Sequence, residues 1–316
     1  MELGRLKQVR VPTIASKTKP IIRKIAEKEG YDNAPKVFMF FSVDLESFTQ
    51  FKTENKEWPL ITMYFYASIV RNVDKVFQNA IVWKYIGDEV LFYIEVSEIN
   101  EILEAPASLH AAMMTTQTEV QAKAKSTLHL KGALWLASVK PVNGDKLGED
   151  VSNIYVDLPK EQYTAKNISK DFIGVDIDEG FRMSKNSSQG KLVLDPKIAF
   201  LIVKYSNRGL DKRSSDASKN AKIVGYCFMK GIWKERAYPV IWYTCDWNER
   251  NMLLYDEHIT NEFARNLLYE SKEVRPLKHI NKIFSSTDRA KKTVADIEYV
   301  LKKAKPRMKQ SFEDNS

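Results

Sequence analysis

Two short motifs hold the residue types best suited to chemistry, and each places an aspartate after an apolar run. Asp44 follows the apolar segment 38–43, and Asp88 follows segment 81–86 in a Gly-Asp turn. A carboxylate beside an apolar strand is costly unless something compensates its charge. If the two strands are neighbours, both carboxylates lie at one end of a sheet. Two hard oxygen ligands with open coordination positions suit Mg²⁺ or Mn²⁺ carrying a polyphosphate, which indicates phosphoryl or nucleotidyl transfer.

The same two residues also have a purely structural interpretation. An aspartate after a strand is often a helix cap, and Gly-Asp is a common pair in hairpin turns. Taken alone, Asp44 or Asp88 fits that interpretation. Taken together they favour a metal, because each follows an apolar strand and the segment between them fits one helix and one strand.

The elements that must position these residues follow a simple order. Hydrophobic patterning predicts strands and helices in turn over 36–43, 58–79, 81–86, 89–96, 106–125 and 128–140. This β-α-β-β-α-β order is the ferredoxin-like plan of an α+β fold. Beyond it we expect a turn and helix over 171–187, a strand and short helix over 191–204, and a hairpin formed by 222–230 and 238–246.

Length and composition favour one folded domain with extensions at both ends. A chain of 316 residues can bury one good core. We expect a basic N-terminal arm over 1–34, the main domain over 35–247, and a helical basic extension and tail over 248–316.

The expected location is the cytoplasm. No run of 18 apolar residues is present, and the N-terminal segment lacks the apolar stretch of a signal peptide. The two cysteines, Cys227 and Cys245, do not have metal-binding spacing, which agrees with a reducing compartment. We therefore expect no membrane partner.

The net charge of +8 is concentrated near the two ends of the chain. Residues 271–310 hold 12 Lys and Arg against 4 Asp and Glu, and residues 1–30 hold 8 against 3. Basic ends on a nearly neutral body could contact nucleic acid or an acidic partner. No aromatic-studded basic stripe accompanies them, so the sequence does not favour nucleic acid as the partner.

Taken together, the motifs resemble the class III nucleotidyl cyclases, the adenylate and guanylate cyclase catalytic domain. That family opens with Phe-x-Asp-Ile-x-Gly-Phe-Thr, and this chain has Phe-Ser-Val-Asp-Leu-Glu-Ser-Phe-Thr, with Asp44, Phe48 and Thr49 in register. The second metal aspartate of the family lies in Ile-Gly-Asp, which Asp88 matches. The resemblance covers roughly residues 36–246 and implies the class III cyclase fold with an extra C-terminal hairpin and helices.

The resemblance implies a two-metal site for a nucleoside triphosphate. Asp44, Leu45 and Asp88 would hold two Mn²⁺ or Mg²⁺ ions, and the backbone N–H groups of Leu45 to Phe48, which open a helix, would face the triphosphate. A ribose 3′-hydroxyl would attack the α-phosphate and expel pyrophosphate. Of two lysines on the predicted hairpin, Lys230 and Lys234, either could neutralise the outer phosphates.

A later family motif has an asparagine four residues before an arginine, which corresponds to Asp178 and Arg182 here. Arg182 would stabilise charge on the α-phosphate. The residues that read the base in the adenylate-type members correspond to Lys84 and Asp171. Two departures stand out: Ser47 replaces a glycine in the phosphate-facing turn, and Asp178 replaces the ribose-orienting asparagine, which a carboxylate cannot match as a donor.

These positions also have structural alternatives. Arg182 could pair with Glu179 on the same helix. Lys84 could be an exposed strand lysine, and Asp171 could be a helix cap or turn residue.

Within the class, the segments 87–92 and 176–182 look most like the bacterial pyrimidine nucleotide cyclases of the Pycsar antiphage defence system. This implies conversion of CTP or UTP to the cyclic mononucleotide, which a separate effector protein reads. The family also implies a head-to-tail homodimer with composite sites. Lys84 as donor and Asp171 as acceptor suit cytosine or adenine, and the pyrimidine-type motifs favour CTP.

Four alternatives remain open at this point. One is an adenylate cyclase that makes cyclic AMP, and a second is an inactive cyclase-fold module that binds a nucleotide. The intact Asp44, Asp88 and Arg182 argue against the second. A diguanylate cyclase relative would need two glycines before Asp-Glu, where this chain has Ile86. A basic nucleic-acid-binding protein would show salt-dependent binding to duplexes.

Overall fold

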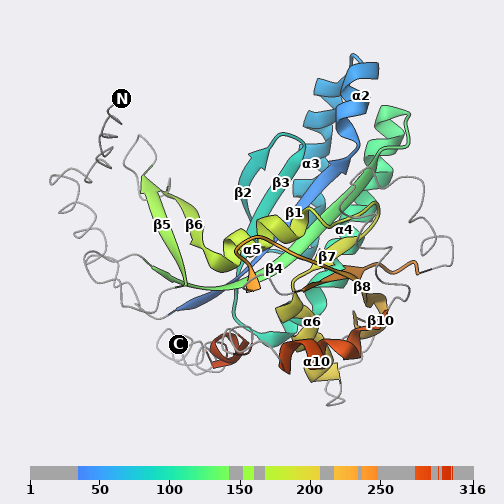
Figure 1. Cartoon of the computed structure of the whole chain (residues 1–316). Helices are drawn as coiled ribbons and strands as arrows, with labels where there is room; N and C mark the ends of the chain where they lie inside the picture. Colours follow the sequence, from blue (N-terminus) through green and yellow to red (C-terminus); the bar gives the residue numbers. More distant parts are fainter. Residues whose placement is uncertain are drawn as a thin grey trace, which may run out of the picture.

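The computed structural model describes residues 35–141, 152–159, 168–206, 217–233, 237–247, 275–285, 291, 294–299 and 301 (Figure 1). The predicted arm over 1–34, most of the extension over 248–316, and Lys234 lie outside these residues. The domain boundaries therefore stay predictions.

The first half of the fold confirms the predicted ferredoxin-like arrangement. In chain order its elements are β1 (Lys36–Glu46), α2 (Phe48–Glu54), α3 (Trp58–Val76), β2 (Ile81–Ile86), β3 (Glu89–Val96), α4 (Ile99–Ala124) and β4 (His129–Pro141). The strands lie in the order β4-β1-β3-β2, and each neighbouring pair is antiparallel. β1 occupies the centre because it is apolar on both faces, as a strand covered on both sides must be.

Two of these elements extend beyond their predicted bounds. β1 continues to Glu46, so Asp44 lies inside the strand rather than after it. α4 begins at Ile99, earlier than the predicted start, and contains Pro106. A capping box between Glu98 and Glu101 fixes this earlier start, since each side chain accepts a hydrogen bond from the other residue's backbone.

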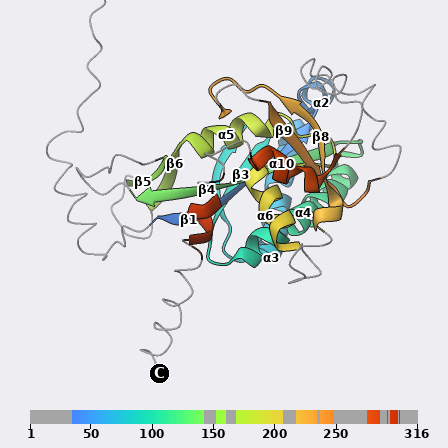
Figure 2. The same cartoon turned by 60° about the horizontal axis from the view of Figure 1, so that its bottom comes forward.

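The second half extends the sheet. β7 (Leu192–Leu194) pairs parallel to β4, and the predicted hairpin of β8 (Ala221–Cys227) and β9 (Tyr238–Tyr243) follows. Beside these strands lie α6 (Pro196–Ser206), the short β10 (Arg275–Pro276), η3 (Leu277–His279) and α10 (Ile280–Ser285). Figure 2 shows α10 next to α6. Among the described residues, no helix has the length and apolar character needed to span a bilayer.

A second hairpin was not predicted. β5 (Asn153–Pro159) and β6 (Ile168–Gly174) pair with each other, and β5 joins the end of β4 through a short parallel contact. Figure 1 shows this hairpin standing away from the rest of the sheet. β6 leads directly into α5 (Val175–Ser184), where the sequence indicated a turn leading into a helix.

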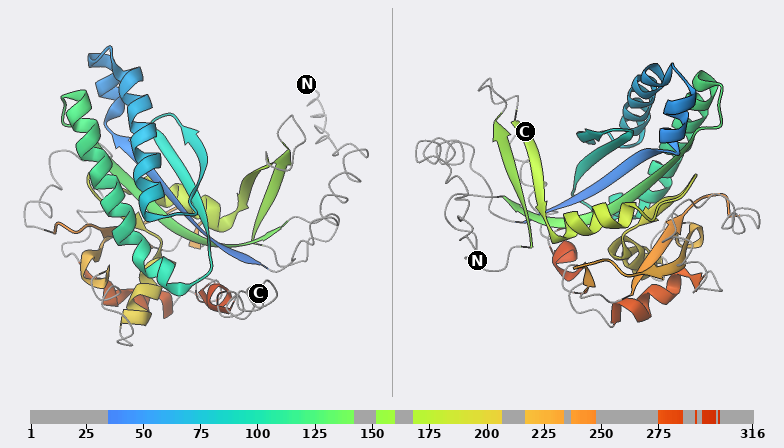
Figure 3. Two further views of the ribbon diagram at one scale, coloured as in Figure 1. Left: turned by 180° about the vertical axis from the view of Figure 1, so that it is seen from behind. Right: turned by 45° about the horizontal axis from the view of Figure 1, so that its top comes forward.

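The sheet has a hydrophobic core on each face. On one face α3 and α4 run side by side, as the left view of Figure 3 shows, and pack on Val37, Met39 and Phe41 of β1. On the other face α5 and β6 cover the aromatic side chains of Phe38 and Phe40. Asp44 follows the even-numbered alternation of β1 and therefore belongs to this second face.

Candidate active site

The two aspartates of the opening motifs lie next to each other at one end of the sheet. Asp44 of β1 is the register partner of Glu89 in β3, directly after the β2–β3 turn that carries Asp88. The backbone N–H of Leu45 donates a 3.2 Å hydrogen bond to the carbonyl oxygen of Asp88, which fastens this turn to β1. The structure thus brings together the two carboxylates that the spacing placed at one sheet edge.

The environment of Asp44 disfavours the ionised form of its carboxyl group. Burial raises the pKa of Asp44 to about 7, although the Lys131 ammonium opposes this shift. The neighbouring carboxylates of Asp88, Glu89 and Glu46 raise the pKa further. A divalent cation would reverse this balance, because it favours the ionised form of both aspartates.

Each of these aspartates has a lysine beside it. Lys131 of β4 is the register partner of Asp44, and its Nζ lies 3.5 Å from Asp44 Oδ2 and 2.9 Å from Glu46 Oε2. The Nζ of Lys52 in α2 lies 3.8 Å from Asp88 Oδ1. The structure therefore places a positive charge beside each of the two carboxylates.

The residues present fit a magnesium or manganese site in which the substrate supplies some of the metal ligands. Mg²⁺ is usually held by one or two carboxylates together with substrate phosphates and water. Among the described residues, no cluster of three or more His, Cys, Asp or Glu side chains could hold a metal ion. Asp44, Asp88 and the backbone carbonyl of Leu45 would thus leave several positions to phosphate and water oxygens.

The turn after β1 is strained at the position where the family has glycine. Ser47 has φ 56° and ψ 24°, the left-handed conformation that glycine adopts most readily. The backbone N–H of Leu45, one of the groups expected to face the triphosphate, already bonds to Asp88, so that part of the expectation is wrong. The Phe48 side chain is buried against Phe51, so Phe48 offers backbone rather than side-chain contacts.

The two predicted base-reading residues form an ion pair. Lys84 Nζ on β2 lies 2.7 Å from Asp171 Oδ1 on β6. The same oxygen accepts hydrogen bonds from Trp83 Nε1 at 3.1 Å and from the backbone N–H of Phe172 at 3.0 Å. Asp171 lies inside β6, so the helix-cap alternative for it is wrong.

Asp178 and Arg182 lie one turn apart on α5, and both are exposed. The alternative in which Arg182 pairs with Glu179 is wrong, because Glu179 is buried and its Oε2 lies 3.7 Å from Lys197 Nζ. A Cβ at Gly231 would lie 3.8 Å from Arg182 Nη1, so Arg182 rests against the segment after β8. Lys230, also exposed, belongs to that segment.

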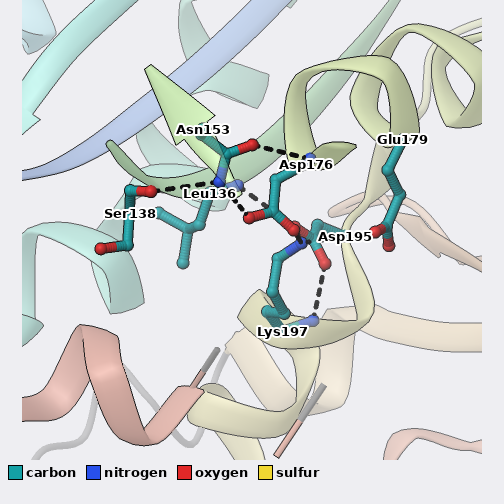
Figure 4. A network of polar contacts seen from close by, with 7 residues as sticks. All are labelled: Leu136, Ser138, Asn153, Asp176, Glu179, Asp195 and Lys197. Carbon is teal, nitrogen blue, oxygen red and sulfur yellow. Dashed lines mark hydrogen bonds and ion pairs between the residues drawn. The ribbon is translucent and has the colours of Figure 1, made fainter. Parts of the chain in front are cut away.

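A buried ionic network fixes the helix that carries Arg182 (Figure 4). Lys197 Nζ lies 2.9 Å from Asp195 Oδ2 and 3.2 Å from Asp176 Oδ1. Asp176, in the first turn of α5, exchanges two hydrogen bonds with Asn153 of β5, at 2.6 and 2.9 Å. Burial alone would lower the pKa of Lys197, but Asp176, Asp195 and Glu179 together raise it.

Close packing against the sheet adds to this anchor. A Cβ at Gly180 would meet the Trp135 ring at 2.3 Å, so α5 approaches β4 more closely than any side chain at this position would permit. The side chains of Asp178 and Arg182 are thus presented from a helix fixed on its buried side.

Several residues of this region were not predicted. Lys131, Glu46 and Glu89 lie beside Asp44, and Trp83 lies beside Asp171. Glu89 directly follows Asp88, a signal the sequence did contain. The position of Lys131 depends on the pairing of β1 with β4, which a single sequence does not reveal.

The described contacts form two groups. Asp44 and Asp88 connect with Lys131 and Lys52, while Lys84 connects with Asp171. Within the described residues, no hydrogen bond or ion pair joins the aspartate pair to Arg182 or to the Lys84–Asp171 pair.

No protein-family model matches the chain, and no curated protein matches it in sequence. Its backbone is similar to solved cyclase structures. The guanylyl cyclase Cya2 has 11% identity and a TM-score of 0.47, with 69% of this chain and 96% of that chain covered. The adenylyl cyclase CyaB from P. aeruginosa has 11% identity and a TM-score of 0.46, with 69% and 98% covered.

An adenylate/guanylate cyclase/hydrolase from Silicibacter pomeroyi has 12% identity and a TM-score of 0.41, with 67% of this chain and 98% of that chain covered. These are likenesses of the backbone, and none of them assigns an activity to this chain.

Proposed function

We propose that this protein is a nucleotide cyclase that converts a nucleoside triphosphate, preferentially CTP or else UTP, to the 3′,5′-cyclic mononucleotide and pyrophosphate. The observation that carries the proposal is the pair Asp44 and Asp88, two neighbouring carboxylates at one end of the sheet. The Lys84–Asp171 pair supports it with a second, separate set of polar groups on the same chain.

Asp44, Asp88 and the carbonyl of Leu45 would hold Mn²⁺ or Mg²⁺. The bound metal would activate the 3′-hydroxyl and neutralise phosphate charge. Arg182, a planar cation at any working pH, would bind the α-phosphate as its charge develops. Lys230, which is exposed beside Arg182, suits the outer phosphates, and Lys234 remains an alternative. Asp178 would accept a hydrogen bond from a ribose hydroxyl.

The base preference follows from donor and acceptor chemistry. The two hydrogen bonds of Asp171 described above both end on Oδ1, and its Oδ2 would accept from an exocyclic amine. Lys84 would donate to the neighbouring ring nitrogen. Cytosine and adenine present that pattern, whereas uracil and guanine present a ring N–H and a carbonyl. The resemblance to pyrimidine cyclases favours CTP, and cyclic AMP formation is the second candidate because adenine offers the same edge.

The separation of the two contact groups supports a composite site. A head-to-tail homodimer would bring Asp44 and Asp88 of one copy to Lys84, Asp171 and Arg182 of the other. The cyclic product would act as a second messenger for a separate effector protein in antiphage defence.

One experiment tests the substrate. The purified protein is incubated with an equimolar mixture of ATP, CTP, GTP and UTP and Mn²⁺, and the products are identified by mass. We expect cyclic CMP to predominate. Predominant cyclic UMP or GMP would contradict the Lys84–Asp171 interpretation, predominant cyclic AMP would contradict only the pyrimidine preference, and no cyclic product would contradict the function.

A further inference from the structure

Each of the two aspartates proposed to bind the metal has an ammonium group beside it. Lys131 Nζ lies 3.5 Å from Asp44 Oδ2, and Lys52 Nζ lies 3.8 Å from Asp88 Oδ1. The side chains of Lys131 and Asp44 are 25% and 27% exposed, so water screens this pair incompletely. Mg²⁺ binds its oxygen ligands at about 2.0–2.1 Å, and a divalent cation at this site would repel an ammonium group held on the same oxygen.

Each lysine also has a second contact that does not involve its aspartate. Lys131 Nζ lies 2.9 Å from Glu46 Oε2, closer than it lies to Asp44. Lys52 Nζ lies 5.0 Å from the ring centre of Phe48 and 5.9 Å from that of Trp58, within the range of cation–π attraction. Either ammonium group can therefore leave its aspartate without losing every favourable partner.

We propose that Lys131 and Lys52 are resident counter-cations of Asp44 and Asp88, and that they withdraw to their second contacts when divalent metal binds. The inference rests on the proposed metal role of the two aspartates. The two lysines offset the charge of a local group of four carboxylates, namely Asp44, Glu46, Asp88 and Glu89. Like charges this close are unfavourable without such compensation.

This arrangement couples metal binding to nucleotide binding. Metal alone must displace two ammonium groups, which weakens its affinity. A triphosphate supplies new negative charge near the site and so offers the displaced lysines further partners. Metal and nucleotide are therefore expected to strengthen each other's binding by the same factor.

The test measures Mn²⁺ affinity by titration calorimetry without nucleotide, so it does not depend on turnover. Lys131→Met keeps most of the length of the side chain and removes its charge, and we expect Mn²⁺ to bind about tenfold more tightly. Lys52→Met should tighten binding less, because its contact with Asp88 is longer. Lys131→Arg should stay near wild type because the charge remains.

Lys36→Met is the matched control. Lys36 pairs with Glu95 at 3.0 Å, starts the same strand β1, and lies at the opposite end from Asp44. Its loss should leave Mn²⁺ affinity unchanged. Thermal unfolding with and without Mn²⁺ shows whether each variant is folded, and Mn²⁺ should raise the Tm of Lys131→Met more than that of wild type.

Two results would overturn the inference in different ways. If Lys131→Met binds Mn²⁺ no more tightly than wild type while Asp44→Ala loses binding, the metal site stands and the lysines are not counter-cations. If Asp44→Ala binds Mn²⁺ as wild type does, the proposed metal site fails and the inference fails with it.

Discussion

Asp44 combines two properties that conflict in the absence of a cation. It is mostly buried on the aromatic face of the sheet, and three other carboxylates lie near it. Lys131 relieves part of this cost through its ammonium group. Such a position destabilises the fold, and titratable groups in positions of this kind are common in active sites.

The raised pKa of Asp44 leads to a prediction about stability and pH. The folded chain holds the Asp44 proton up to about pH 7, while the unfolded chain releases it near the ordinary value of 3.8. Between these two values the folded state binds more protons, so metal-free stability should fall as the pH rises. Urea unfolding across pH 4.5–7.5 should show a smaller decline for Asp44→Asn than for wild type. Equal declines would contradict the assigned shift.

The proposed role of Asp171 as an acceptor for the base leads to a prediction about base preference. Asp171→Asn places an amide where the structure has a carboxylate, and an amide N–H can donate to a carbonyl. We expect the ratio of cyclic CMP to cyclic UMP to fall by about tenfold, since a mismatched polar contact costs about 1–3 kcal/mol. Asp74→Asn on the distant helix α3 is the control. An unchanged product ratio would remove Asp171 from base recognition.

At the scale of elements, the anchoring of α5 is the main determinant of where Arg182 lies. Lys197→Met would leave Asp176, Asp195 and Glu179 buried with no ammonium between them. Breaking a buried ionic group in this way costs about 3–5 kcal/mol, and the midpoint of urea unfolding reports it. Lys36→Met, which removes a partly exposed pair, should cost less than about 1 kcal/mol. Equal losses would show that the network of Figure 4 does not anchor the helix.

The secondary-structure elements also show how much of the fold could be predicted from the sequence. The apolar runs of the four strands β1 to β4 and the helical patterns of α3 and α4 were enough to predict the βαββαβ order. The β5–β6 hairpin was missed, because β5 joins the sheet through two register pairs with β4 and both strands carry polar residues. Because the hairpin was missed, the contact between Asp171 of β6 and Lys84 was missed as well.

The site was also predictable only in part, because only some of its residues belong to local sequence motifs. Local motifs located Asp44, Asp88 and the helix of Arg182, because each follows a short pattern along the chain. Lys131 and Lys197 act through partners distant in sequence, and those partners are set by strand pairing and helix packing. No local pattern encodes such contacts.

For the whole molecule, the proposed composite site leads to a prediction about mixed dimers. Asp44→Ala and Arg182→Ala should each be inactive alone. A mixture of the two should regain activity, because one of the two sites in each heterodimer receives no substitution. Activity is measured after subunit exchange, which differently tagged copies report. Exchange without recovery would show that both residues serve one site within a single chain.

The most direct test of the central claim is to follow both products of a single-substrate reaction. With CTP and Mn²⁺, wild type should release one pyrophosphate for every 3′,5′-cyclic CMP formed, identified by mass and by its resistance to phosphomonoesterase. Asp44→Ala and Asp88→Ala should lose at least 90% of this activity while keeping cooperative unfolding, since removal of an essential metal ligand costs several kcal/mol in the transition state. Formation of CDP with phosphate, or of linear CMP with pyrophosphate, would contradict the claim that this protein is a cyclase.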